Sequence, residues 1–365
     1  MMSLLTSLLW CLLAASLCFG HPHTPPSLRT YTNQTHFAGV NICGFDFGCN
    51  NQGSCNLSGV DPPVRNIPPT HSDNLTNDGE AQMGHFVHAN GLNIFRLPVS
   101  WQYLTNNTLG GPLNPTHFGY YDQLVQSCLQ TSAHCQIDLH NYARWEGAVI
   151  GEPNGPSREV FADIWTQLAK KYASQKKIRF GIMNEPHDME SAEGWAASVQ
   201  AAVTAIRNAG ATTQYISLPG TSFQSAGALM YDGSGVALAK VTNPDNSTTR
   251  LVFDVHLYLN EFGNGDTPEC ITNGTAKAWE PLAAWLRKMG RQAIVSETGG
   301  GNTNSCKMFV CQELDYPRSN FDVFLGYVMW AAGSFSSSYV LSLAPVDEDD
   351  SWKDTELMTA CVSRH

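Results

Sequence analysis

The sequence is short of basic residues. It has 21 Lys and Arg against 32 Asp and Glu, a formal net charge of −11 over 365 residues, and no block of clustered Lys or Arg. Binding to nucleic acid or to an anionic membrane surface depends on clustered positive charge. The composition therefore argues against nucleic acid and membrane partners and favours a neutral ligand or substrate.

Several motifs that mark common chemistries are also missing. The sequence has no GxSxG for a serine hydrolase and no HExxH for a zinc hydrolase. No CxxC or HxxxH spacing supports a zinc site, and no GxGxxG or GxxxxGK[ST] follows an expected strand. With 42% hydrophobic and 15% charged residues, the composition is still that of a globular protein rather than a disordered one.

The first 20 residues carry no charge, and residues 4–19 form an apolar run broken only by Thr6, Ser7 and Ser16. This run is shorter than the roughly 20 residues that span a bilayer, and no basic residue follows until Arg29. We interpret residues 1–20 as a signal peptide, with a membrane anchor as the alternative. Residues 21–36, rich in Pro and Thr, are interpreted as a flexible leader, and residues 37–365 as one folded domain.

A signal peptide predicts that the protein is secreted, and disulfides persist in the oxidising environment outside the cell. Eleven cysteines, less Cys11 and Cys18 of the expected signal peptide, leave nine. Two pairs are close enough in sequence to suggest local bridges, namely Cys49 with Cys55 and Cys128 with Cys135, whereas the sequence alone does not pair Cys270, Cys306, Cys311 and Cys361. One cysteine must be odd, and Cys43 is the candidate because it lies in the apolar run VNICGF, where a thiol packs as a small hydrophobe. Sequons at Asn33, Asn56, Asn74, Asn106, Asn246 and Asn273 suggest some surface glycosylation.

Eight short apolar runs recur along the chain, as expected for strands that are buried on both faces. They span residues 37–44, 93–99, 134–140, 177–184, 214–220, 251–258, 292–298 and 325–333. Apolar residues at helical spacing lie between several of them, at 121–129, 161–172 and 195–206. This alternation predicts a parallel α/β fold, and eight strands are the number that closes a single (β/α)₈ TIM barrel. An open doubly wound sheet is the alternative, but its glycine-rich motif is missing.

Polar residues gather at the ends of these runs, where the loops of a barrel form its functional face. They are Arg96, His140, Asn141, Asn184, Glu185, His256, Tyr258, Glu297 and Trp330. A buried Glu without a partner costs several kcal/mol, so Glu185 and Glu297 indicate either ion pairing with Arg96 or a catalytic pair.

Two carboxyls that face one glycosidic bond suffice for its hydrolysis, because one protonates the leaving oxygen while the other attacks or activates water. Arg96 and Tyr258 could keep a nucleophilic carboxylate ionised and oriented. Asn184 could hold a sugar hydroxyl. Trp330 and Trp145 could stack on the apolar face of a pyranose ring.

These residues lie in motifs that resemble the secreted, fungal-type endo-β-1,4-glucanases of glycoside hydrolase family 5. The motifs are GVNICGFDFGC (39–49), IFRLPVSWQYL (94–104), DLHNYARW (138–145), FGIMNEPHD (180–188), FDVHLYL (253–259), IVSETGGGN (294–302) and GYVMWAAGSF (326–335). The similarity runs from about residue 37 to residue 361. The most specific feature is NEP followed about 110 residues later by the glutamate of SETGGGN.

The resemblance implies a (β/α)₈ barrel and a retaining double displacement, with Glu185 as the acid/base and Glu297 as the nucleophile. It assigns supporting roles to Arg96, His140, Asn184, His256, Tyr258 and Trp330, and it implies no metal and no organic cofactor. Its disulfide pattern adds Cys270–Cys306 and Cys311–Cys361 to the two local bridges and leaves Cys43 free. Phe223 stands where relatives often have Trp, so it would offer a smaller sugar-binding platform.

The sequence thus predicts a monomeric enzyme that cleaves internal β-1,4-glucosidic bonds of cellulose and related β-glucans. Two alternatives in the same family are an endo-β-1,4-mannanase and a mixed-linkage β-glucanase. A non-catalytic secreted carbohydrate-binding protein is an alternative of a different class.

Overall fold

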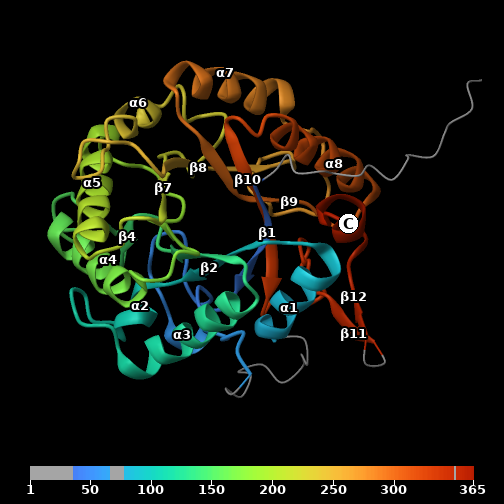
Figure 1. Ribbon diagram of the computed structural model, residues 1–365, viewed down its shortest axis with the longest axis horizontal. Coiled ribbons are helices and arrows are strands. Elements are labelled where there is room, and N and C mark those ends of the chain that lie inside the picture. The colour runs from blue at the N-terminus through green and yellow to red at the C-terminus, as the bar shows by residue number, and fades with distance from the viewer. Residues whose placement is uncertain (1–35, 66–77, 349–350) are drawn as a thin grey trace, which may run out of the picture. The chain divides into compact units, whose positions relative to one another are not determined.

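Parallel strands close into a barrel at the centre of the protein, with helices around them (Figure 1). The computed structural model describes residues 36–65, 78–348 and 351–365. Within these ranges the barrel has eight strands in the order β1-β10-β9-β8-β7-β6-β3-β2. The strands are β1 (Phe37–Cys43), β2 (Ile94–Val99), β3 (His134–Leu139), β6 (Ile178–Gly181), β7 (Tyr215–Pro219), β8 (Leu251–Tyr258), β9 (Ala293–Gly299) and β10 (Phe324–Gly333). Each matches one expected apolar run within a few residues, which confirms the predicted barrel. The expected signal peptide and nearly all of the leader lie outside the described residues.

Helices connect successive strands and cover the outside of the barrel (Figure 1). They are α1 (Gly79–Asn90), α2 (Trp101–Thr105), α3 (Pro115–Gln130), α4 (Arg158–Tyr172), α5 (Ala192–Asn208), α6 (Ser234–Leu238), α7 (Glu280–Met289) and α8 (Asn304–Ser319). The expected helical faces at 121–129, 161–172 and 195–206 lie in α3, α4 and α5 and are largely buried. Side-chain caps start these helices, as when Ser157 accepts a hydrogen bond from the Val160 N–H. None of the described helices combines the length and the apolar character needed to cross a membrane.

Shorter elements lie in the connections between barrel strands and in the segment that follows β10. Two small antiparallel pairs, β4 (Arg144–Trp145) with β5 (Ala148–Val149) and β11 (Val346–Glu348) with β12 (Ser351–Lys353), were not expected from the sequence. Three further helical turns are η1 (Leu57–Gly59), η2 (Thr275–Trp279) and η3 (Met358–Val362). Elements of two or three residues leave too short a pattern for sequence periodicity to detect.

The barrel interior changes character along its axis. Near the amino ends of the strands, Phe37, Ile94 and Val252 belong to a buried apolar cluster that closes this end. Towards the carboxyl ends, the buried interior side chains include Arg96 and Glu297. The apolar end and the packed shell between barrel and helices provide the rigid frame on which these polar side chains stand.

Four disulfides join Cys49 to Cys55, Cys128 to Cys135, Cys270 to Cys306 and Cys311 to Cys361. This pattern confirms both the local bridges expected from spacing and the two pairings implied by the resemblance. Cys43 is free and fully buried at the end of β1. Burial raises the pKa of its thiol well above the usual value, so it stays protonated.

The cysteine pattern predicts one chemically distinct thiol in protein that lacks residues 1–20. Alkylation of the denatured but unreduced protein should label Cys43 alone, and the folded protein should resist the reagent because the thiol is buried and protonated. Peptide mass mapping reads out the label, with a fully reduced sample as the control in which all nine cysteines react. A bridged Cys43, or a second free thiol, would contradict this assignment.

Candidate active site

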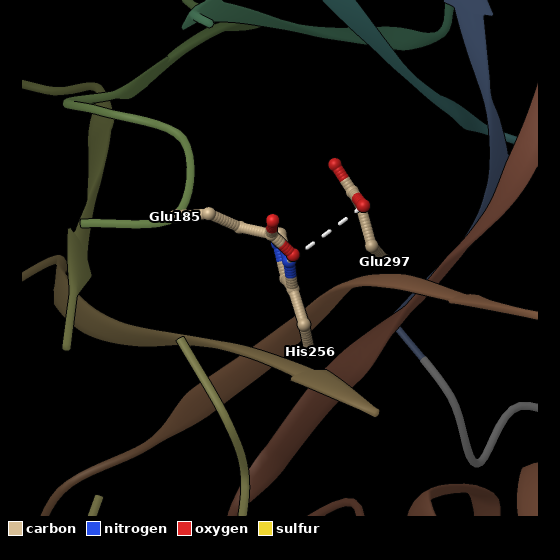
Figure 2. Close-up of side chains that lie close together, drawn as sticks. All are labelled: Glu185, His256 and Glu297. Atoms are coloured by element: carbon tan, nitrogen blue, oxygen red, sulfur yellow. Dashed lines mark hydrogen bonds and ion pairs between the residues drawn. The ribbon is translucent and has the colours of Figure 1, made fainter. Parts of the chain in front are cut away.

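Glu185 and Glu297 approach each other at the carboxyl end of the barrel. Glu297 lies in β9, and Glu185 follows β6. An oxygen of each carboxyl and a ring nitrogen of His256 lie within 4.8 Å of one another. In Figure 2 the Glu185 side chain extends towards Glu297, the His256 ring lies at the Glu185 carboxyl, and a dashed line leads across to a Glu297 oxygen. The two glutamates predicted from strand ends therefore form a close pair.

The Glu297 carboxylate is held by two donors. Arg96 Nη1 lies 2.5 Å from Oε1, and the Tyr258 hydroxyl donates to Oε2 at 2.9 Å. Burial disfavours the charge on Arg96, but Asp138 and Glu297 outweigh this effect and raise the pKa of the guanidinium. Arg96 is thus a permanent cation that stabilises the negative charge of Glu297 and fixes the direction of its oxygens.

The Glu185 carboxyl has different surroundings. Burial is the main cause that raises its pKa from 4.5 to about 7, while the charges of His140, Arg96 and His187 act in the opposite direction. His256 Nδ1 lies 2.9 Å from Glu185 Oε1 and 3.6 Å from Glu297 Oε2. Burial lowers the pKa of His256 to about 4, so its ring is neutral near pH 7. One carboxyl is therefore hydrogen bonded to a permanent cation, and the other retains a proton near neutral pH, a contrast that acid/base chemistry needs.

A loop after β7 sets the position of Glu185. Gln224 Oε1 accepts a hydrogen bond of 2.6 Å from the Glu185 backbone N–H, and the backbone N–H of His256 donates to the Gln224 backbone carbonyl at 2.9 Å. Glu185 has a φ of 44° and Gln224 a φ of 55°, a region that non-glycine residues rarely occupy. Gln224 was not predicted as a site residue, because it lies in a loop that has no recognisable sequence motif.

Arg96 gathers further polar residues around the pair. Its guanidinium donates to Asn41 Oδ1 at 2.9 Å and to Asn184 Oδ1 at 2.7 Å, and it forms a 2.9 Å ion pair with Asp138. Asn184 therefore lies where the sequence predicted it. Asn41 and Asp138 were not predicted as site residues. Each is a single polar residue inside an apolar strand, and such a residue alone does not indicate a site.

His140 and Trp330 form one wall of the site. His140 Nδ1 lies 2.9 Å from Asp138, and its ring stacks on Trp330 with centroids 5.7 Å apart. The two residues border a hollow of about 400 Å³ that is also lined by Phe47 and Phe335. A half-buried Trp beside an aromatic-lined hollow fits a flat, partly apolar ligand such as a sugar ring.

Phe223 lies on the Glu185 side. The residue is 42% exposed, and its ring stacks on His187 with centroids 4.2 Å apart. Its backbone N–H donates to the carbonyl of Pro186, next to Glu185, at 3.0 Å. The structure therefore places this predicted platform near the acid/base candidate with one face available to a ligand.

Asn141 and Trp145 make packing and positioning contacts instead. Asn141 Oδ1 accepts from the Trp101 N–H at 2.6 Å, and its amide donates to Gln102. Trp145, in β4, packs edge-on against Trp101. Neither is among the described residues that hydrogen bond to Glu185 or Glu297, so direct ligand contact by these two stays a prediction.

The chain matches known proteins along most of its length. The family model described as cellulase (glycosyl hydrolase family 5) matches residues 56–333. The chain is 56% identical to endoglucanase EG-II of Hypocrea jecorina over 90% of this chain and 77% of that protein. It is 45% identical to endoglucanase 1 of Saitozyma flava over 86% of each. The crystal structure of Cel5A (EG2) from Hypocrea jecorina superposes with a TM-score of 0.87 at 55% identity, covering 90% of this chain and 98% of that one.

The surroundings of Glu185 predict a glutamate that titrates near pH 7. ¹³C NMR of protein labelled at Glu carboxyls should show this titration in the wild type and not in Glu185→Gln. A carboxyl with a raised pKa stabilises the fold fully below about pH 4.5, and this contribution is lost as pH rises through about 7. Glu185→Gln should therefore gain stability relative to the wild type between pH 5 and pH 8, measured by urea unfolding. A Glu185 titration near pH 4.5 would contradict the interpretation.

Proposed function

The chain belongs to the cellulase family, glycosyl hydrolase family 5, and we propose that it is a secreted endo-β-1,4-glucanase that acts by a retaining double displacement. The observation that carries this proposal is the close pair of Glu185 and Glu297 in contrasting surroundings. The proposed substrate is cellulose and related β-glucans, cut at internal bonds.

In the first step Glu297 attacks the anomeric carbon while Glu185 protonates the departing glycosidic oxygen. Retaining enzymes place their carboxyls about 5–5.5 Å apart, whereas inverting enzymes need about 6.5–9.5 Å to admit water. A Glu185 oxygen and a Glu297 oxygen within 4.8 Å of each other support the shorter, retaining arrangement. Glu297 is therefore the nucleophile, since Arg96 and Tyr258 orient it as an anion.

In the second step the Glu185 carboxylate removes a proton from water, and the water oxygen attacks the anomeric carbon. Glu297 then leaves as a carboxylate stabilised by Arg96 and Tyr258, the same contacts that oriented it before attack. A glutamate whose pKa is near 7 suits both tasks, because it gives and takes a proton readily near neutral pH.

The polysaccharide is proposed to lie across this pair. Trp330 beside His140 on one side and Phe223 on the other support sugar stacking on both sides of the cleaved bond. Asn184, fixed by Arg96, is proposed to contact the sugar hydroxyl next to the reacting carbon. The intact carboxyl pair and its hydrogen bonds favour an enzyme over a non-catalytic binding protein.

The remaining proposals concern the mature protein. We propose that residues 1–20 are removed on export, that residues 37–365 form the catalytic domain, and that the enzyme acts as a monomer outside the cell. Four disulfides support an oxidising compartment.

Substitution of each glutamate tests the assigned roles. Glu297→Gln should lose nearly all turnover on cellooligosaccharides while keeping its fold, because an amide neither attacks nor leaves. Glu185→Gln should be similarly impaired on cellooligosaccharides but much less in the first step on 2,4-dinitrophenyl β-cellobioside, whose leaving group needs little protonation. Burst kinetics separates the two steps, and circular dichroism checks folding. Wild-type-like turnover in a folded Glu297→Gln protein would falsify the assignment.

The double displacement predicts that the first-formed product keeps the β configuration. Proton NMR during early hydrolysis of cellopentaose should show the β anomer first, with the α anomer appearing only by mutarotation. Pre-equilibrated cellobiose provides the reference spectrum. An α anomer that appears first would mean an inverting reaction.

The equatorial 2-hydroxyl of glucose predicts a preference for glucan over mannan, in which this hydroxyl is axial and misaligned with Asn184. We expect kcat/KM for cellopentaose to exceed that for mannopentaose by at least about tenfold, or about 1.4 kcal/mol of transition-state binding. Equal chain lengths keep the number of occupied sugar sites comparable. A preference for mannopentaose would leave the mechanism intact and move the enzyme to the mannanase alternative.

A further inference from the structure

Three aromatic side chains at the hollow are carried by the end of β10 and the segment after it. Trp330 lies in β10, Phe335 lies just beyond the end of this strand, and their ring centroids are 5.8 Å apart. The Trp330 indole N–H donates to the Tyr339 hydroxyl at 3.0 Å, and the Tyr339 ring stacks on Phe335 at 4.1 Å. These three residues form an aromatic wall. Its position depends on the path of the backbone between Trp330 and Phe335.

Gln82 holds this backbone at Gly333, the last residue of β10. The Gly333 N–H donates to Gln82 Oε1 at 2.7 Å, and Gln82 Nε2 donates to the Gly333 carbonyl at 3.0 Å. Both residues are buried. A side-chain amide has a donor group and an acceptor group, so a single Gln satisfies both peptide groups of one residue. The double displacement assigns no task to Gln82.

The chain has little room to adjust at this point. Gly333 has a φ of 88°, and a Cβ atom added there would lie 2.3 Å from the Cys43 carbonyl oxygen. The next residue, Ser334, donates its backbone N–H to the same carbonyl at 2.9 Å. The backbone of β10 therefore lies against β1 on one side and is held by Gln82 through both peptide groups of Gly333.

A second amide holds β10 before Trp330. The Asn41 side chain donates to the carbonyls of Met329 and Ser296 at 3.0 Å each. Asn41 also accepts a hydrogen bond from Arg96, so a change at Asn41 would disturb the charged network as well. Gln82 has no such link among the hydrogen bonds of the described residues, which makes it the cleaner site for a test.

Gln82 acts from a helix that is itself tied in place. It lies in α1, where Glu80 accepts a hydrogen bond of 2.8 Å from Gln123 of α3. Further along the same helix, His85 Nε2 lies 2.9 Å from a carboxylate oxygen of Asp354 in the C-terminal segment. Contacts at two levels of α1 fix the helix against its neighbours, so the Gln82 amide has a firm support.

We propose that Gln82 is a positioning residue that sets the aromatic wall for sugar binding by holding both peptide groups of Gly333. This inference rests on the proposed function, because it takes the wall to bind the sugars of a β-glucan. Without the amide, a buried N–H and a buried carbonyl would lose their partners, which is costly. The end of β10 would move to regain partners, and Trp330 and Phe335 would move with it.

The proposal predicts a change in substrate binding rather than in bond cleavage. Sugar stacking on the wall is the same before and during the reaction, and loss of such uniform binding raises KM while kcat stays nearly constant. Gln82→Met keeps the length of the side chain and removes both hydrogen bonds. We expect it to raise KM for cellopentaose about fivefold and to change kcat by less than about twofold.

A double-mutant cycle tests whether Gln82 acts through the wall. The wild type, Gln82→Met, Trp330→Ala and the double variant are compared by KM for cellopentaose. In the Trp330→Ala background, Gln82→Met should have a much smaller effect, because the main ring that it positions is already gone. A second readout needs no turnover: the Trp330 indole N–H resonance in ¹H–¹⁵N spectra, assigned by its loss in Trp330→Ala, should shift in Gln82→Met.

Gln214→Met is the matched control. Gln214 is also a buried amide that binds backbone groups, since its Nε2 atom donates to the carbonyls of Ala173 and Gln175 at 2.9 and 3.1 Å. It precedes β7 and so lies at the amino end of the barrel, away from the site. This variant should lower thermal stability but leave KM and the Trp330 resonance unchanged.

Gln82→Glu provides a conservative rescue. At pH 5 a protonated carboxyl keeps one donor and one acceptor for Gly333, because burial without a cation raises the pKa of a carboxyl. KM relative to the wild type should therefore be near one at pH 5 and should rise towards pH 9, where the ionised carboxyl has no donor. Circular dichroism establishes that each variant is folded.

The outcomes separate the role of Gln82 from the proposed function. A wild-type KM in folded Gln82→Met, or equal rises in KM with and without Trp330, would overturn the positioning role. If Gln82→Met does not fold, a KM ratio for Gln82→Glu that is constant between pH 5 and pH 9 would overturn it. Failure of the wild type to cleave cellopentaose would instead reject the proposed function, and the Trp330 resonance would still test Gln82. A rise in KM that needs Trp330 supports the proposal.

Discussion

The burial of Arg96 inside the barrel is the constraint on which the rest of the site depends. Its side chain is fully buried, and its guanidinium faces two carboxylates, Asp138 and Glu297. A buried cation without partners would be strongly unfavourable, and so would two buried carboxylates without a cation. The three charges therefore have to be present together, and the hydrogen bonds to Asn41 and Asn184 complete the set. Once this network is formed, the carboxylate of Glu297, the proposed nucleophile, has little freedom to move.

The second glutamate is controlled by different means. Glu185 follows β6 with a positive φ, and the side chain of Gln224 holds its backbone N–H. Backbone strain of this kind persists only where the surroundings determine the conformation, and here the β7 loop and β8 do so. Holding a group in its reactive position before substrate binds removes reorganisation from the reaction itself. The barrel thus fixes one carboxyl by charge and the other by backbone geometry.

The sequence predicted the parts of the fold that have a repeated pattern. The strand runs and the helical faces match because burial on both faces of a strand, or on one face of a helix, leaves a period that can be counted. Glu185 and Glu297 were found because a strand end is where a charged residue departs from that pattern. Asn41, Asp138 and Ser296 were missed because they lie within strands. Whether such a residue faces the site depends on how the strands pair in the barrel, which the sequence pattern does not give. Trp145 was predicted as a sugar platform from its residue type, and only the structure shows it packing edge-on against Trp101.

The charged residues inside the barrel lower the stability of the fold, but they also form the candidate active site. Burying a charged side chain costs free energy. Four such side chains nevertheless lie inside this barrel, namely Arg96, Asp138, Asp254 and Glu297. The fold tolerates them because most of the surrounding interior is apolar, both in the cluster at the opposite end of the barrel and in the shell under the helices. Burial also changes the chemistry, because it disfavours the charged form of a carboxyl and raises the pKa of Glu185 to about 7. Glu297 is buried as well, but the Arg96 guanidinium lies 2.5 Å from its Oε1 atom. The contrast between the two glutamates therefore comes from their partners, and a barrel without the buried Arg96 would lose that contrast.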